Sequence, residues 1–112
     1  MLTFVLKRRW FDKIKSGEKT VEYREVKPYW TARLWYSGCL PTDCFVWDYE
    51  EIQKSIDNFI FPIECRLRLG YKSDEVLSAF VKRVEIINGK DTDLHIDKPV
   101  YAIHLKDIKE CV

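Results

Sequence analysis

The sequence contains few cysteines and no long hydrophobic run, and these two absences exclude whole classes of protein. Four cysteines in 112 residues are too few for a small fold held together by disulfides. We interpret all of them as thiols: Cys39, Cys44, Cys65 and Cys111. No apolar run approaches the roughly 18 residues of a membrane-spanning helix. The opening residues MLTFVLKRRW place charge after a short apolar stretch, the reverse of a secretory signal. We therefore expect a cytoplasmic protein without a membrane partner.

The common signatures of metal, cofactor and nucleophile chemistry are also missing. Cys39 and Cys44 have no histidine nearby, and His95 and His104 lack the spacing of metal ligands. The sequence has no glycine-rich phosphate loop, no dinucleotide-binding fingerprint and no Ser-His-Asp set. We therefore expect neither a metal ion nor a cofactor.

Basic and acidic side chains are almost balanced, 19 against 18, with a net charge of +1, so no global positive field indicates nucleic acid. Their distribution is uneven. Residues 1–36 hold nine basic and four acidic side chains (+5), residues 37–64 hold one and six (−5), and residues 65–112 hold nine and eight (+1). The acidic middle is a possible surface for a protein partner.

Hydrophobic periodicity divides the first half of the chain into short elements of both kinds. It predicts a strand at 2–7, a helix around 10–14 that ends at Gly17, a strand at 19–25 and a helix from Pro28 to near Gly38. Asp48 and Glu51 resemble a capping box, which predicts that a short helix carrying Ile52 and Ile56 begins there.

The second half is expected to form strands. Residues 63–69 alternate apolar and charged side chains, which predicts a strand with a cationic outer face. Residues 76–87 fit either a helix or a strand by spacing, and the β-branched ending VKRVEII favours a strand. Asn88-Gly89 predicts a turn, 91–97 a loop and 100–106 a last strand. About five strands and two or three helices indicate an α+β fold, whose strands would hide their edges by closing into a small β-barrel.

The pattern most informative about function is Gly17-x-Lys19-x-x-Glu22-x-Arg24, at the junction of the first helix and the second strand. Glu22 and Arg24 project from one face of the strand, about 7 Å apart at roughly 3.3 Å per residue. An arginine held by a carboxylate is oriented for a planar phosphate, carboxylate or base edge. The alternative is a solvated strand face with a weak ion pair.

Residues 10–34, WFDKIKSGEKTVEYREVKPYWTARL, closely resemble the ASCH family, the activating-signal-cointegrator homology domains, in the form of small bacterial and phage proteins. The family hallmark G-x-K-x-x-E-x-R is matched at all four positions. Arg68-x-Gly70-Tyr71 resembles the RNGY-type end of a later family strand, with Leu69 in place of a polar residue. The resemblance implies a single PUA-like domain over residues 1–112, with a divergent acidic insertion at about 39–61.

In function, the resemblance implies a cationic cleft that binds RNA or a small nucleotide-like ligand. Lys19, Glu22 and Arg24 would line this cleft, with Lys19 and Arg24 at phosphate and Glu22 orienting Arg24 or accepting from a base amine. Arg68 and Tyr71 are further candidate ligand-binding residues. Among the aromatic residues, Trp35 or Tyr36 is a candidate for stacking on a base, whereas Trp30 and Leu34 are expected in the core.

The same resemblance implies an alternative function as a hydrolase, because some small relatives remove an acyl group from modified cytidine. Those enzymes look to use a lysine at the position of Lys19 and a threonine nucleophile, whose place Glu22 takes here. A carboxylate nucleophile would form a mixed anhydride instead of an ester, so binding is the first expectation. If the chain is an enzyme acting on a modified nucleoside or on RNA, its catalytic candidates are Lys19, Glu22 and Thr20.

Overall fold

The computed structural model describes residues 2–38, 49–57, 60–71 and 74–111. In chain order they form β1 (Leu2–Leu6), α1 (Arg8–Lys15), β2 (Val21–Glu25), α2 (Pro28–Gly38), α3 (Tyr49–Asp57), β3 (Ile63–Leu69), β4 (Val76–Asn88) and β5 (Pro99–Glu110). All five expected strands are present, so the α+β prediction is confirmed. No helix within these ranges is long and apolar enough to cross a membrane.

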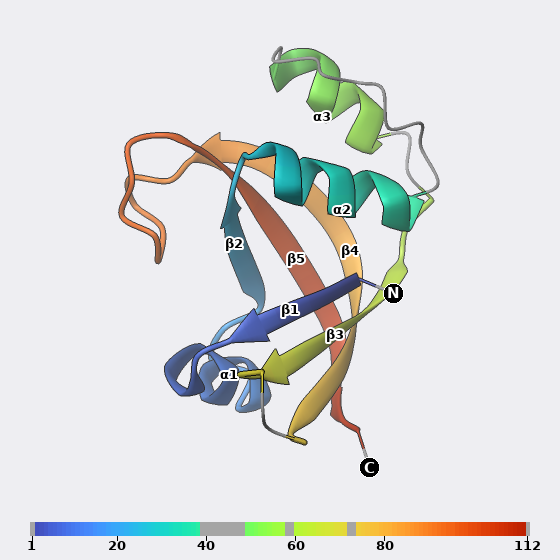
Figure 1. Ribbon diagram of the computed structural model, residues 1–112, viewed down its shortest axis with the longest axis vertical. Coiled ribbons are helices and arrows are strands. Elements are labelled where there is room, and N and C mark those ends of the chain that lie inside the picture. Colours follow the sequence, from blue (N-terminus) through green and yellow to red (C-terminus); the bar gives the residue numbers. More distant parts are fainter. Residues whose placement is uncertain (1, 39–48, 58–59, 72–73, 112) are drawn as a thin grey trace.

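The strands form one curled sheet in the order β1-β3-β4-β5-β2. β1 pairs with β3 in parallel, and the other neighbours are antiparallel. Figure 1 shows that the sheet bends into a half-barrel whose two edge strands, β1 and β2, face each other. The expected closure is therefore incomplete in the described part of the chain, because side chains, and not a backbone ladder, connect these two edges.

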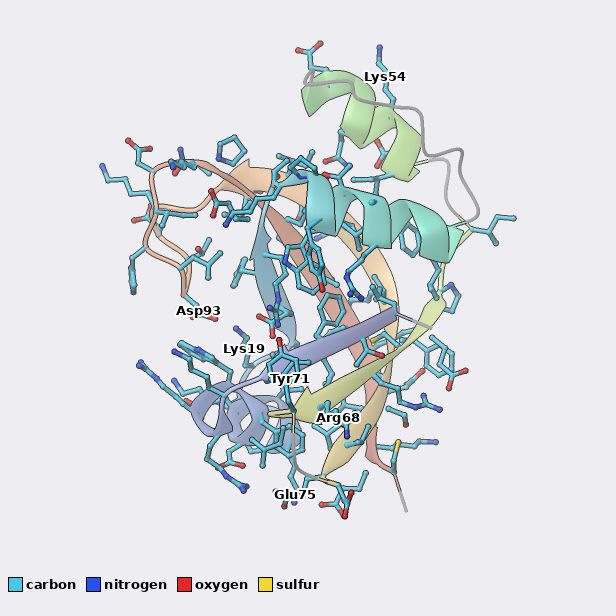
Figure 2. All side chains as sticks on the ribbon, in the orientation of Figure 1. Lys19, Lys54, Arg68, Tyr71, Glu75 and Asp93 are labelled. Carbon is cyan, nitrogen blue, oxygen red and sulfur yellow. The ribbon has the colours of Figure 1, made fainter. Side chains whose placement is uncertain are left out.

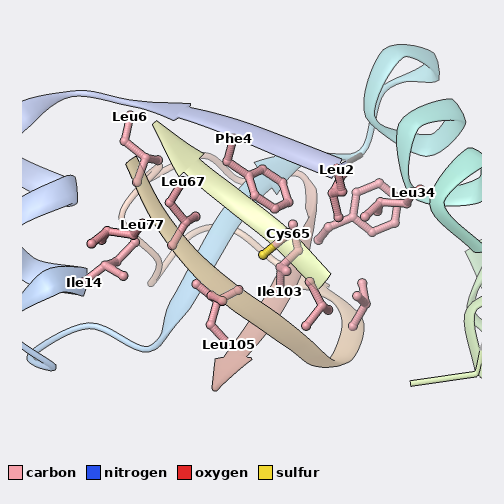
Figure 3. Close-up of a cluster of buried hydrophobic side chains, with 14 of the residues drawn as sticks. Leu2, Phe4, Leu6, Ile14, Leu34, Cys65, Leu67, Leu77, Ile103 and Leu105 are labelled. Atoms are coloured by element: carbon pink, nitrogen blue, oxygen red, sulfur yellow. The ribbon is translucent and has the colours of Figure 1, made fainter. Parts of the chain in front are cut away.

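The core fills the concave side of this half-barrel (Figure 3). Alternate residues of each strand point into it, as expected for β3, in which Cys65, Leu67 and Leu69 are buried between exposed or partly exposed neighbours. Phe11 and Ile14 of α1 close one end of the barrel, and Leu34 of α2 lies at the other. The expected core position of Leu34 is confirmed, with 3% of its surface exposed.

The helix-like spacing of residues 76–87 has a simple cause. β4 is a strand with irregular register between Ser78 and Phe80 and between Val81 and Arg83. A bulge inserts one extra residue into a strand, so Val81 and Val84 are both buried although three positions separate them. This is the spacing that a helix would also produce.

The described part of the acidic segment is α3, which packs on β4. Ile56 is buried, as its place on the expected helix suggests. The side-chain amide of Gln53 donates to the carbonyl of Val84 (3.1 Å) and accepts from the backbone N–H of Ile86 (2.8 Å). It thus takes the place of a neighbouring strand at the end of β4 that extends beyond its pairing with β3. The proposed cap at Asp48 lies outside the described residues.

The cysteines that the structure describes are free thiols, Cys65 buried and Cys111 exposed. Burial raises the pKa of Cys65 to about 12, so this thiol stays protonated and acts as a small apolar residue of the core. Cys39 and Cys44 lie outside the described residues.

Candidate functional site

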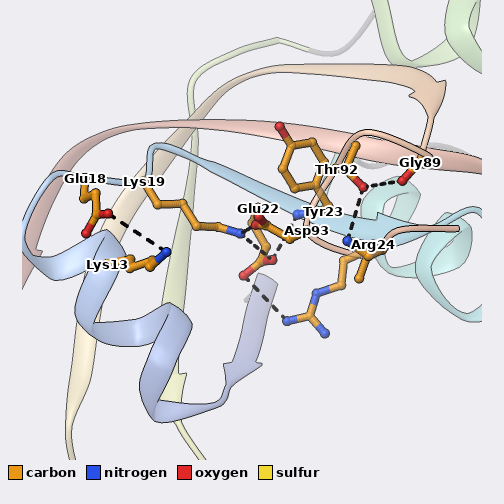
Figure 4. Close-up of polar contacts among 10 residues, drawn as sticks. Lys13, Glu18, Lys19, Glu22, Tyr23, Arg24, Gly89, Thr92 and Asp93 are labelled. Carbon is orange, nitrogen blue, oxygen red and sulfur yellow. Dashed lines mark hydrogen bonds and ion pairs between the residues drawn. The ribbon is translucent and has the colours of Figure 1, made fainter.

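A cavity of about 430 Å³ occupies the open side of the half-barrel, between β1 and β2. The motif residues Lys19, Glu22 and Arg24 line it, together with Trp10 of α1 and Trp30 of α2. A loop that connects β4 and β5 supplies Asp93. Figure 4 shows the polar contacts among these side chains. We call this hollow the inner cavity.

The end of α1 positions the first motif residue. Gly17 has a φ of +84°, a left-handed conformation that glycine adopts at little cost. The chain then reverses, and the backbone N–H of Lys19 donates to the carbonyl of Lys13 at 3.0 Å. β2 begins at Val21, two residues later than the sequence predicts. Lys19 therefore lies on the turn, at the entrance to the strand.

Glu22 is buried, with 5% of its surface exposed. Its Oε1 accepts a hydrogen bond from the N–H of Tyr23 at 2.9 Å and lies 3.7 Å from Lys19 Nζ. Its Oε2 has no hydrogen-bond partner among the described residues, although Arg24 Nη2 is 3.9 Å away. The alternative of a solvated strand face is therefore wrong for Glu22, because this face of β2 points into the half-barrel.

Arg24 connects the two edges of the sheet. Its Nη2 donates to the carbonyl of Val5 on β1 at 3.1 Å. Its guanidinium carbon lies 4.7 Å from the ring centroid of Trp30 and 5.5 Å from that of Phe4. Arg24 Nε is buried and lacks a partner among the described residues. The side chain of Arg24 therefore connects β2 to β1 across the open seam, where the two strands form no backbone ladder.

The attraction between Glu22 and Arg24 does not fully offset the cost of burying them. Burial raises the pKa of Glu22, and Arg24, Lys19 and the N–H of Tyr23 only partly oppose this. Burial likewise lowers the pKa of Arg24, against the opposing effect of Glu22. Both shifts favour the neutral form. Their charged neighbours therefore compensate only part of the cost of burying Glu22 and Arg24.

Lys19 forms an ion pair with Asp93, and Figure 2 shows the loop that carries Asp93 next to Lys19. Its Nζ lies 4.6 Å from the ring centroid of Trp10 and 5.2 Å from that of Tyr23. The sequence alone does not distinguish Asp93 as a site residue. Its one signal is an acidic loop between two strands of the sheet, and that loop contains other acidic residues that do not line the cavity.

Gly89 fixes the loop that carries Asp93. Its carbonyl accepts hydrogen bonds from the hydroxyl of Thr92 (2.8 Å) and the N–H of Ile96 (3.2 Å). A Cβ at this position would lie 2.6 Å from Val100 Cγ1 and 2.9 Å from the Ile96 carbonyl, which is too close for any real side chain. The tight packing holds Asp93 over Lys19.

A second hollow of about 330 Å³, the outer cavity, adjoins the first. Both are lined by Trp10, Lys19, Tyr23 and Asp93. Thr20 is exposed and lines only the outer cavity, whereas Glu22 lines only the inner one. Lys19 therefore lines both cavities. The three candidate catalytic residues do not line one common cavity, because Thr20 and Glu22 lie in different ones.

Two further candidate binding residues, Arg68 and Tyr71, line neither cavity. Arg68 is exposed on β3, and Tyr71 is 83% exposed just beyond that strand. Trp35 is in α2, but its side chain lies outside the described residues. Trp30, expected in the core, packs on the edge of the core and also lines the inner cavity.

The raised pKa of Glu22 predicts a specific pH dependence of stability. As the pH rises above the ordinary glutamate value, the unfolded chain ionises first, while the folded protein still holds its proton at Glu22. The contribution of Glu22 to the free energy of unfolding therefore falls as the pH rises through the raised pKa. Urea unfolding of wild type and Glu22→Gln should show wild type relatively more stable at about pH 4 than at about pH 8. A difference that is constant or grows with pH would contradict this assignment.

Comparison of the chain with models of protein families, with curated proteins and with solved structures gives no significant match.

Proposed function

We propose that the protein is a nucleotide- or RNA-binding module of the ASCH type and that its inner cavity receives a nucleobase. The volume of about 430 Å³ lies within the roughly 300–1,000 Å³ typical of small-molecule sites. The free thiols of Cys65 and Cys111 agree with a reducing, cytoplasmic location.

The charges inside the cavity favour a base over a phosphate. Lys19 is paired with Asp93, and Arg24 lies 3.9 Å from Glu22, so neither cation brings a full uncompensated charge. A phosphate placed deep in this cavity would also meet the buried carboxylate of Glu22, and like charges at short range repel strongly. A neutral base with donors and acceptors on its edge avoids this repulsion.

The single observation that carries the proposal is the unpartnered Oε2 of Glu22. Buried polar atoms are normally hydrogen-bonded, and each exception calls for an explanation. Neither this oxygen nor Arg24 Nε, which also lacks a partner among the described residues, has exposed surface of its own. A base amine or ring N–H would satisfy the oxygen, and an acceptor beside it on the base would satisfy Arg24 Nε, once rotation of the two side chains turns these atoms toward the cavity. The indole of Trp10 and the indole of Trp30 supply apolar surface on the same cavity.

Titration by NMR tests the proposal without altering the protein. We expect a mixed-sequence single-stranded RNA, and separately the four ribonucleotides, to shift the backbone amide of Tyr23 and the indole N–H of Trp10. The amides of Lys54 and Ile56 on α3 serve as the internal control, because these residues do not line the cavity. Shifts that are absent, or that occur only on α3, would contradict the proposal.

One observation favours the hydrolase as a second candidate function. Glu22 combines burial and a raised pKa with a lysine ammonium 3.7 Å from its Oε1, an arrangement suited to general acid-base catalysis. If the protein turns over an acylated cytidine and Glu22→Gln does not, this activity is established. Binding without turnover would support a binding function alone.

A further inference from the structure

Three cations surround one indole ring beside the outer cavity. The guanidinium carbon of Arg9 lies 4.5 Å from the ring centroid of Trp10, Lys13 Nζ 5.4 Å and Lys19 Nζ 4.6 Å. No other aromatic ring in the described ranges has as many cations within this distance. We call Arg9, Lys13 and Lys19 the Trp10 cluster.

The folding pattern brings these cations together from two places. Arg9 and Lys13 are one turn apart on α1, and such neighbours share a face of the helix. Lys19 joins them because the chain reverses at Gly17. The cations repel one another, and a shared anion would relieve that repulsion.

The counter-charges of the protein are incomplete. Lys19 is paired with Asp93, which is part of the cavity wall, and Lys13 lies 3.9 Å from Glu18. That second distance is too long for a hydrogen bond, and the side chain of Glu18 is 67% exposed, so Glu18 can move away at little cost. Figure 4 shows Lys13 beside Glu18, and Lys19 reaching toward Glu22 and Asp93.

The outer cavity offers room for an anion beside this cluster. Lys13, Lys19 and Thr20 line it, and the Lys19–Asp93 ion pair lines both this cavity and the inner one. Lysine ammonium groups and a threonine hydroxyl are donors suited to phosphate oxygens. A ligand whose base lies in the inner cavity would therefore carry its sugar past Tyr23 and present its phosphate to the cluster.

We propose that the outer cavity is a phosphate subsite formed by Lys13 and Lys19 of the Trp10 cluster, so that the ligand is a nucleotide or a strand of nucleic acid and not a free nucleoside. This inference rests on the proposed function for the placement of the base. In the unliganded protein the carboxylate of Asp93 is the anion paired with Lys19. When the ligand binds, its phosphate and Asp93 both contact the Lys19 ammonium. Asp93 therefore weakens phosphate binding and selects ligands that also fill the inner cavity.

Calorimetry with ribonucleosides, with their 5′- and 3′-monophosphates and with a short single-stranded RNA tests the subsite. Wild type should bind the phosphate-bearing probes more tightly than the nucleosides. Lys13→Ala should weaken the phosphate-bearing probes by roughly three- to tenfold and leave the nucleosides unchanged, because Lys13 does not line the inner cavity. Asp93→Asn should strengthen the monophosphates by about threefold. Lys54→Ala, on α3 and far from Lys19 (Figure 2), is the matched control.

The RNA and the monophosphates distinguish the two sources of the phosphate. For the RNA, Lys13→Ala should also reduce the slope of log affinity against log salt by about 0.7. Tighter binding of RNA than of any monophosphate would identify a strand as the ligand, and equal binding would identify a mononucleotide.

Two further results separate this inference from the proposed function. Equal affinity of wild type for nucleosides and monophosphates, or monophosphate binding unchanged by Lys13→Ala, would overturn the phosphate subsite and leave the base-binding cavity in place. If no nucleoside or nucleotide binds, inorganic phosphate alone should still shift the Trp10 indole resonance in wild type and less in Lys13→Ala. That result would support an anion subsite and reject the proposed function, and absence of the shift would reject both.

Discussion

Replacing Glu22 by glutamine is expected to weaken nucleotide binding by roughly ten- to a hundredfold. The amide keeps the shape of the side chain but lacks the negative charge, and one of its two terminal atoms becomes a donor. A base N–H that faces Oε2 would lose a charge-assisted hydrogen bond or meet an amide donor. A hydrogen bond to a charged group contributes about 1.5–3 kcal/mol, which corresponds to the stated loss.

The matched control for this experiment is Glu64→Gln. Glu64 is exposed on β3, pairs with Arg66 at 2.6 Å and does not line either cavity, so its substitution should leave nucleotide affinity unchanged. Calorimetry gives both affinities, and circular dichroism shows whether each variant keeps its fold. Equal affinity of folded Glu22→Gln and wild type would mean that the ligand does not contact this carboxylate.

Removal of Arg24 should reduce the free energy of unfolding by about 2–4 kcal/mol. Arg24→Ala leaves the carboxylate of Glu22 buried without its neighbouring guanidinium and removes the donor to the Val5 carbonyl. It also removes the stacked contact with Trp30. Because this side chain connects β1 to β2 across the open seam, its loss separates the edges of the half-barrel.

Arg8→Ala is the informative comparison for Arg24→Ala. Arg8 lies only 2.9 Å from Glu75, closer than Arg24 lies to Glu22, yet its side chain is 61% exposed. Exposed pairs contribute about 0–1 kcal/mol, so Arg8→Ala should have the smaller effect in urea unfolding. The double variant Glu22→Gln/Arg24→Ala should lose less stability than the sum of the single variants, because no charge stays buried alone. Equal losses for Arg8→Ala and Arg24→Ala would contradict the seam assignment.

The secondary structure of this protein is readable from its sequence because the signals are local. Gly17, Pro28 and the Asn88-Gly89 turn separate the elements, and the alternation in 63–69 fixes the buried face of β3. β4 is ambiguous only because a bulge places Val81 and Val84 on one face. The curling of the sheet is expected on general grounds, because short strands hide their edges by closing. The open seam is not predictable, because it depends on side chains from two distant strands.

The candidate site is predictable in part. The motif identifies Lys19, Glu22 and Arg24, and the structure brings all three to one cavity. The alternation of β2 does not show which face is buried, since burial of a carboxylate depends on cations that only the folded chain supplies. Asp93 is 74 positions from its partner Lys19, and no local pattern distinguishes it from the other acidic residues of its loop.

A crystal structure with a bound ribonucleotide is the most direct test of a base-binding cavity. The proposal predicts the base between β1 and β2, with one of its N–H groups about 3 Å from Glu22 Oε2. A base bound elsewhere on the surface, with that oxygen still lacking a donor, would contradict it.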